Sequence, residues 1–129
     1  MTASAEQITA TIDRYTEVFS AGDRAGYLAL FADDATVEDP VGADVARGTE
    51  AIAVFWDGVR AMAAEITLVR TGPPRIAAGE AAFPMRAITN LGEIRLGVDI
   101  IDVMAFADDG RITSLRAFWD PSDMAPVEA

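Results

Sequence analysis

One aspartate lies on a face of the chain that is otherwise apolar, in the segment EIRLGVDIIDVMAFA at residues 93–107. The alternate positions of this segment are Ile94, Leu96, Val98, Ile100, Asp102, Met104 and Phe106. An ionised carboxylate in the middle of such a face would be costly unless it were paired. Burial can raise the pKa of an aspartic acid by as much as ~3–5 units, which keeps it protonated near neutral pH. A neutral Asp102 would be a hydrogen-bond donor.

Tyr15 and Asp39 are also polar residues at positions where the local pattern is otherwise apolar. Tyr15 lies on the apolar stripe of a predicted helix, so its phenol is expected to point inward. In the stretch ATVEDPVG, residues 35–42, Asp39 falls on the apolar side of a short predicted strand. Asp39 would have to be ionised to act as a base, so its surroundings must differ from those of Asp102. Two carboxyls and a phenol with different protonation states favour an acid/base site.

Each of these residues also has a purely structural interpretation. Tyr15 could be a core aromatic, and Asp39, which precedes a proline, could simply end a strand. Asp102 could form a buried ion pair with Arg86 or Arg116. The combination of the three residues, more than any one of them, favours catalysis.

Composition restricts the chemistry further. The 129 residues carry 21 acids and ten basic residues, a formal charge of −11, which argues against nucleic acid or an anionic membrane as partner. The chain contains no Cys, His or Lys, which excludes thiol and imidazole nucleophiles, Schiff-base chemistry and the usual zinc sites. Residues 1–129 are expected to form one cytoplasmic domain with a loose tail at 120–129, since the N-terminus is polar and no run approaches membrane-spanning length.

The first half of the chain shows helical patterns. Ser4 and Gln7 predict a capping box for a helix that ends at Gly22. A second, short helix is expected over 24–32 and a third over 48–65. The apolar stripe of the first helix is Ile8, Ile12, Tyr15 and Phe19, and the buried side of the third is Ile52, Phe55, Trp56, Val59 and Met62.

From residue 65 onward the apolar period changes to two, which predicts strands. These are expected at 66–70, 75–78, 81–88, 93–107 and 111–119, after a first strand at 35–40. Helices followed by a block of strands predict an α+β fold, with a curved antiparallel sheet closed on one side by helices. The Asp39–Pro40 bond could be cis, but only about 5–6% of X–Pro bonds are, so a cis bond is not predicted.

The order of these motifs resembles the steroid Δ5-3-ketosteroid isomerases. The resemblance lies in TIDRYTEVFSAGD, LFADDATVEDPVG and VDIIDVMAFADDGRITSLRAFW, and covers residues 8–119. It implies the cone-shaped α+β fold of nuclear transport factor two, a homodimer, and no metal or cofactor. By position it implies that Asp39 is the general base, Tyr15 the oxyanion-hole phenol and Asp102 a protonated acid beside it. This family is itself the standard example of a carboxylic acid kept neutral by an apolar site.

The resemblance also implies an apolar, steroid-like small molecule as substrate, whose double bond moves from Δ5 to the conjugated Δ4 position through a dienolate. Family members often have further tyrosines bonded to the oxyanion phenol, but the matching places here hold Phe31 and Trp56. The substrate-lining positions are Phe31, Trp56, Phe83, Met85, Val98 and Trp119. Two alternatives remain open: a polyketide-cyclase-like enzyme acting on another enolisable ketone, and a non-catalytic carrier of an apolar ligand.

Overall fold

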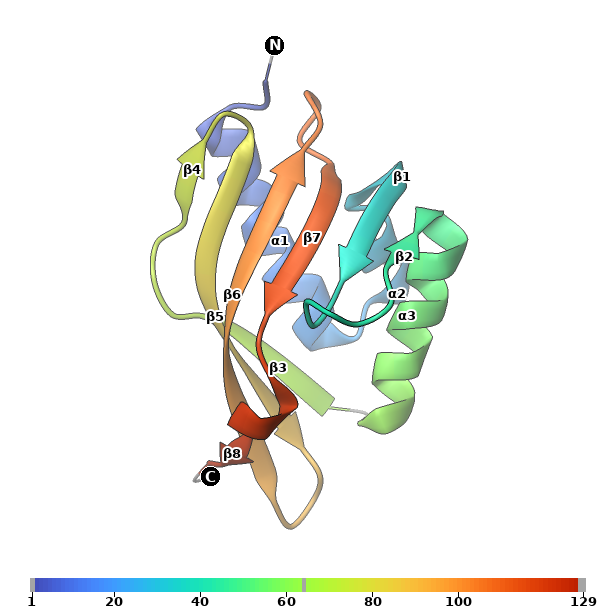
Figure 1. Ribbon diagram of the computed structural model, residues 1–129, viewed down its shortest axis with the longest axis vertical. Coiled ribbons are helices and arrows are strands. Elements are labelled where there is room, and N and C mark those ends of the chain that lie inside the picture. The colour runs from blue at the N-terminus through green and yellow to red at the C-terminus, as the bar shows by residue number, and fades with distance from the viewer. Residues whose placement is uncertain (1, 64, 128–129) are drawn as a thin grey trace.

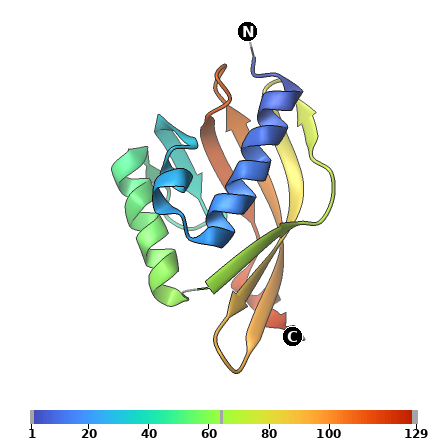
Figure 2. The same ribbon diagram turned by 180° about the vertical axis from the view of Figure 1, so that it is seen from behind.

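A computed structural model describes residues 2–63 and 65–127, which form one curved sheet with helices on one of its faces (Figures 1 and 2). The strands lie in the order β2 (Ala46–Arg47), β1 (Phe31–Glu38), β7 (Ile112–Phe118), β6 (Arg95–Phe106), β5 (Glu80–Asn90) and β3 (Glu65–Arg70). Two short strands pair outside this path, β4 (Arg75–Ala77) with β5 and β8 (Ala125–Pro126) with β6. The helices are α1 (Ala5–Ala21), α2 (Arg24–Leu28) and α3 (Gly48–Met62).

The expected α+β class is confirmed, with one departure from an antiparallel sheet. The pairs β5–β6, β6–β7 and β3–β5 are antiparallel, but β1 pairs with β7 in parallel. Parallel neighbours need a long crossover between them, and here the chain passes through α3 and the rest of the sheet before it returns as β7. The pattern of alternating residues shows which face of a strand is buried, but it carries no information on which strand lies beside it.

Helix α1 forms as its sequence predicts. The Ser4 hydroxyl accepts from the Gln7 backbone N–H at 3.1 Å, and the Gln7 side chain accepts from the Ser4 N–H at 2.8 Å. The helix ends at Gly22, whose φ of 71° is left-handed and favours glycine. Its inward stripe, including Tyr15, is buried, and it packs against β3 (Figure 2).

The junction between α2 and β1 differs from expectation. Helix α2 ends at Leu28, and β1 starts at Phe31 instead of residue 35. The reason is long-range pairing: Phe31 is the register partner of Ile112 on β7, and the Ile112 N–H donates to the Leu30 carbonyl at 2.8 Å. Between Phe31 and Thr36 the register shifts, so the acidic residues 33–34 lie in an irregular part of the strand and do not terminate a helix.

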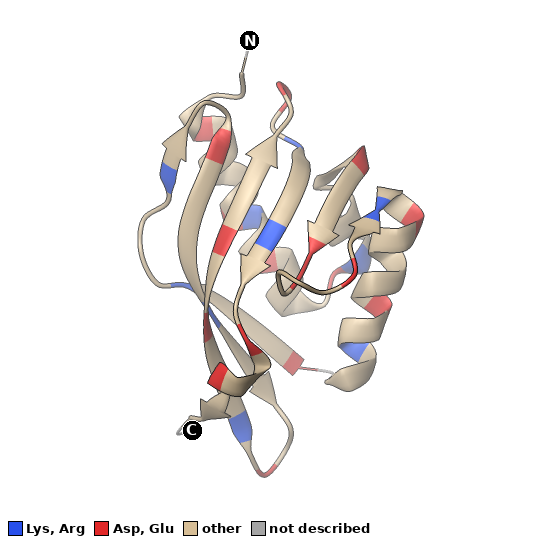
Figure 3. Ribbon diagram, in the orientation of Figure 1, with Lys and Arg blue, Asp and Glu red and all other residues tan. Residues whose placement is uncertain are grey.

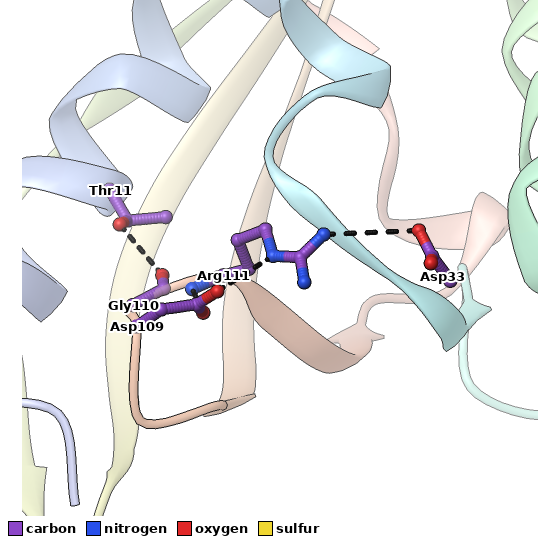
Figure 4. A network of polar contacts seen from close by, with 5 residues as sticks. All are labelled: Thr11, Asp33, Asp109, Gly110 and Arg111. Atoms are coloured by element: carbon purple, nitrogen blue, oxygen red, sulfur yellow. Dashed lines mark hydrogen bonds and ion pairs between the residues drawn. The ribbon is translucent and has the colours of Figure 1, made fainter.

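The turn between β6 and β7 is tied to its surroundings by polar contacts (Figure 4). Thr11 of α1 donates from Oγ1 to the Gly110 carbonyl at 2.9 Å. The Arg111 guanidinium contacts Asp109 at 3.0 Å and reaches Asp33 at 3.8 Å. All three charged groups are solvent-accessible, so these ion pairs contribute little to stability. The hydrogen bond from Thr11 is the contact that joins this turn to α1.

Helix α3 buries Ile52 and Trp56 as predicted, but Met62 is 83% exposed. The expectation that Met62 lies on the buried side is therefore wrong. The helix contacts β1 and β2, and its last turn extends beyond the ends of these two strands (Figure 1). Apolar spacing alone does not show where the covering sheet stops.

The C-terminal segment, expected to be loose, lies against the sheet as far as Val127. A single 3-10 turn, η1 (Pro121–Asp123), leads into β8, whose Ala125 is the register partner of Gly97. The Val127 N–H donates to the Arg95 carbonyl at 2.9 Å. The last two residues of the expected tail, 128–129, lie outside the described residues.

Charged positions are spread over helices, strands and turns (Figure 3). Among the described residues, no helix is long and apolar enough to cross a membrane.

Candidate active site

Asp102 is the buried acid of the site. It is 3% exposed and is the only buried charged residue in the described part of the chain. On β6 it lies between Phe83 of β5 and Ala117 of β7 in the sheet register. Burial raises the pKa of Asp102 well above its ordinary value, and the negative charge of Asp39 raises it further. This shift favours the neutral form of the carboxyl, which is a hydrogen-bond donor.

The alternative of a structural ion pair at Asp102 is not found. Arg86 pairs with Asp99 at 2.9 Å, and Arg116 pairs with Glu38 at 3.0 Å. Within residues 2–63 and 65–127, the Asp102 carboxyl takes part in no ion pair or hydrogen bond. Both arginines lie on the opposite side of the sheet from Asp102, because a strand alternates its side chains between faces.

Tyr15 faces the sheet from the buried stripe of α1. Burial raises the pKa of its phenol well above 10, and the nearby Asp102, Tyr27 and Asp39 raise it further, in that order. The phenol therefore remains protonated and can act as a hydrogen-bond donor. A helix and a strand that are far apart in the sequence thus bring two neutral donors into one region.

Asp39 comes directly after β1 and is partly buried. Its Oδ1 accepts a hydrogen bond of 2.6 Å from the Nε1–H of Trp119. Burial raises the pKa of Asp39, while the bond from Trp119 lowers it and limits the rise. Contrary to expectation, the bond from Asp39 to Pro40 is cis, and the next residue, Val41, donates its N–H to the Ala117 carbonyl at 2.8 Å.

The residues expected to line the substrate belong to the same apolar cluster as Tyr15. All six are present there, five of them buried and Trp119 packed against the cluster: Phe31, Trp56, Phe83, Met85, Val98 and Trp119. Within the described residues, the indole N–H of Trp56 donates no hydrogen bond to Tyr15, so it does not replace a hydroxyl at that position. Two surface hollows, of about 440 and 320 Å³, lie over the start of α1 and over β4 and β5, and Phe83 forms part of the lining of the second.

Sequence reasoning missed Tyr27, on α2. Its side chain is 0% exposed, and its ring centroid lies 6.0 Å from that of Tyr15 and 4.5 Å from that of Trp56. Burial raises its pKa well above 10, and Asp39 and Asp102 raise it further. A signal was available: in a chain without His, Lys or Cys, Tyr27 is the only other phenol.

The arrangement combines a partly buried acid, Asp39, with two buried groups, Tyr15 and Asp102, whose raised pKa values favour their neutral forms. Such a set can remove a proton from carbon and hold the negative charge that develops on an attached oxygen. Among the described residues, no group of three or more acidic side chains is placed to hold a metal ion.

Comparison with known proteins places this chain among relatives of the same size. Residues 12–115 match the model of the SnoaL-like domain. The chain belongs to the SnoaL-like family. This family member is 42% identical over 123 residues to a steroid Delta-isomerase of Nocardioides simplex, covering 95% of this chain and 98% of the relative. The resemblance to steroid isomerases, and with it the expectation of an isomerase, is thereby confirmed.

The fold of this SnoaL-like protein also matches a solved structure. SalBIII, described as an epoxide hydrolase/cyclase-like enzyme in pyran ring formation in the polyether salinomycin, superposes with a TM-score of 0.84. The match covers 95% of this chain and 97% of SalBIII, at 24% sequence identity. At that identity the likeness concerns the fold alone.

Proposed function

We propose that this SnoaL-like protein isomerises 3-oxo-Δ5-steroids to their conjugated Δ4 isomers. The observation that carries the proposal is the buried, unpaired carboxyl of Asp102, in the same region as the phenol of Tyr15. A buried carboxylic acid without a hydrogen-bond partner costs stability, and titratable groups with strongly perturbed pKa values cluster at functional sites. The steroid Delta-isomerase of Nocardioides simplex, 42% identical, supports the same assignment.

Asp39 carries the proton in the proposed reaction. Its carboxylate removes a hydrogen from C4 of the steroid as H⁺, and the C–H electron pair passes into a dienolate with the charge on the ketone oxygen. Asp39 then returns the proton to C6, so that one double bond moves and no atom is gained or lost. A carboxylate suffices as base because the carbonyl and the adjacent alkene both acidify this C–H.

Tyr15 and Asp102 hold the oxyanion. Both remain neutral because burial raises their pKa values, and both therefore donate hydrogen bonds to the ketone oxygen as its charge develops. Removing one such donor typically costs ~10²–10³ in rate. No cofactor is required by this chemistry.

The apolar cluster would receive the steroid rings, with the ketone at the deep end. We expect Phe83, Met85 and Val98 to contact the ligand from the middle of the sheet, Phe31 from the start of β1, and Trp56 from α3. Because the aromatic side chains pack closely around Tyr27, a ligand has to displace them on entry. A flat, rigid ligand keeps this displacement small.

We further propose that the chain is a homodimer that associates through the outer face of the sheet. Pro84, Ile101 and Phe118 are register partners across β5, β6 and β7, so their side chains form one apolar row. Ile101 and Phe118 are both exposed. An apolar row flanked by the ion pairs of Arg86 and Arg116 suits a second copy related by a two-fold axis.

The test is conversion of a 5-ene-3-one steroid to its conjugated isomer, followed by ultraviolet absorbance. The wild-type protein should convert it, and Asp39→Asn should abolish conversion while retaining steroid binding. Unchanged turnover in Asp39→Asn would remove Asp39 from this role. Turnover of an aromatic polyketide ketone but not of the steroid would favour the cyclase-like alternative. Tight steroid binding without exchange of the C4 hydrogen for deuterium would favour a carrier.

A further inference from the structure

The hydroxyl of Tyr27 is buried without a partner. Its side chain is 0% exposed, and among the described residues its Oη makes no hydrogen bond. The great majority of buried polar side-chain atoms in proteins do have a partner. An unpaired hydroxyl carries a desolvation penalty that phenylalanine at the same place would avoid. The hydroxyl therefore needs a reason other than the stability of the unliganded chain.

The position of Tyr27 indicates that reason. Its ring packs at 6.0 Å from the ring of Tyr15, with 40° between the two planes. Both carboxyl groups, Asp39 and Asp102, lie close enough to raise the pKa of Tyr27, as they raise that of Tyr15. The unpaired hydroxyl thus lies in the same electrostatic neighbourhood as the groups of the proposed active site.

We propose that Tyr27 is a third hydrogen-bond donor of the oxyanion site, whose hydroxyl binds the same ligand oxygen as Tyr15 and Asp102. This inference rests on the proposed function. Tyr27 Oη does not bond to Tyr15 in the described structure, so both phenols keep their O–H groups for an outside acceptor. The acceptor is an anionic or strongly polarised oxygen on an otherwise apolar ring system, because only such a ligand fits both the donors and the aromatic walls.

The proposal predicts that Tyr27→Phe weakens ligand binding without lowering the stability of the free protein. The melting temperature of the free protein should be equal or higher, because the variant removes a buried group that has no partner. Binding of a steroid with a phenolic A-ring should weaken about tenfold, because a hydrogen bond to a charged oxygen is lost. Binding of the matching 3-deoxy steroid, which lacks the acceptor oxygen, should not change.

Ser20→Ala is the matched control. It also removes a hydroxyl, but the Ser20 hydroxyl accepts from the Leu68 N–H at 2.9 Å and contacts the Leu68 carbonyl at 3.3 Å. This variant should lower the melting temperature and leave the affinity for the phenolic steroid unchanged. The opposite patterns of Tyr27→Phe and Ser20→Ala separate a ligand-binding hydroxyl from a structural one.

Two further results would overturn the proposal. Equal losses for the phenolic and 3-deoxy steroids would mean that Tyr27 acts by packing. A loss that disappears when Tyr27→Phe is made in a Tyr15→Phe background would mean that it acts through Tyr15 and not on the ligand. Asp102→Ala, which removes the donor, tests the site itself in the same assay: if it weakens phenol binding and Tyr27→Phe does not, the oxyanion site stands and only the third donor fails. If neither variant weakens it, the proposed function fails as well.

Discussion

The indole N–H of Trp119 donates a hydrogen bond of 2.6 Å to Oδ1 of Asp39, which lies 80 positions earlier in the chain. This bond joins the end of β7 to the end of β1. It stabilises the ionised carboxylate against the burial that surrounds it. A carboxylate with too little stabilisation stays protonated and cannot act as a base. A carboxylate with too much stabilisation has a low pKa and removes a proton from carbon poorly. The hydrogen bond from Trp119 therefore helps to set the basicity of Asp39.

Replacing Trp119 by Phe should therefore disturb Asp39. The lost hydrogen bond to the charged form raises the pKa of Asp39 further, so the acid side of the kcat/KM profile for steroid isomerisation should move to higher pH. We also expect kcat to fall about tenfold, because the carboxylate is less well positioned. Trp56→Phe is the control: it makes the same change in the apolar cluster and should leave the position of the acid limb unchanged. An unmoved limb in Trp119→Phe would contradict this role.

The pH profile of the wild-type protein should have two limbs. Turnover should rise with pH as Asp39 ionises, at a pH above the ordinary range for aspartate because burial raises its pKa. It should fall again at higher pH when Asp102, whose pKa is raised further, loses its proton. In Asp102→Asn the alkaline limb should move to higher pH, and kcat should be lower. The two limbs report on coupled groups, so the shift between variants is the informative quantity.

Asp102 should also make stability depend on pH. In the unfolded chain its pKa returns to about 4, whereas in the folded chain it is well above that value. Between these two pKa values the folded state binds more protons, so the free energy of unfolding falls as pH rises, by up to about 1.4 kcal/mol per pH unit. Asp102→Asn lacks this titration. Denaturation by urea at pH 4 to 8 should show the wild-type protein losing stability relative to the variant, and parallel curves would show that the carboxyl is not held neutral.

The proposed dimer can be tested by one charge on the outer face of the sheet. Ile101→Glu places a carboxylate in the middle of the apolar row and should convert a dimer into a monomer in light scattering. Val54→Glu, at an exposed apolar position on α3, is the control and should leave the mass unchanged. A wild-type protein that is already monomeric at high concentration would overturn the dimer proposal.

The buried face of each element could be predicted from the sequence because it depends on period alone. The alternation around Asp102 and the helical stripe containing Tyr15 both place the side chain correctly, since neither requires knowledge of a neighbour. The exposure of Met62 and the early start of β1 at Phe31 could not be predicted in this way. Both depend on where another strand ends or pairs, which is decided by contacts distant in sequence.

In the candidate site, too, local patterns could be predicted from the sequence and distant contacts could not. Asp39 was found from its register in a strand, but its bond to Trp119 joins two strand ends and leaves no local signal. Tyr27 lies on a helix of five residues, which is too short to display a stripe. Its unpaired hydroxyl becomes visible only when the packing of its neighbours is known.

Ala117 relates the two acids of the site to each other. The Ala117 carbonyl accepts a hydrogen bond from the N–H of Val41, two residues after Asp39. Ala117 is also the register partner of Asp102 on the adjacent strand β6. Neighbouring strands keep a spacing of about 4.8 Å. The backbone hydrogen bonds between these strands therefore fix the distance between the backbone positions of Asp39 and Asp102. Substitutions in the helices and in the lining side chains can then change which molecule fits without changing this backbone separation.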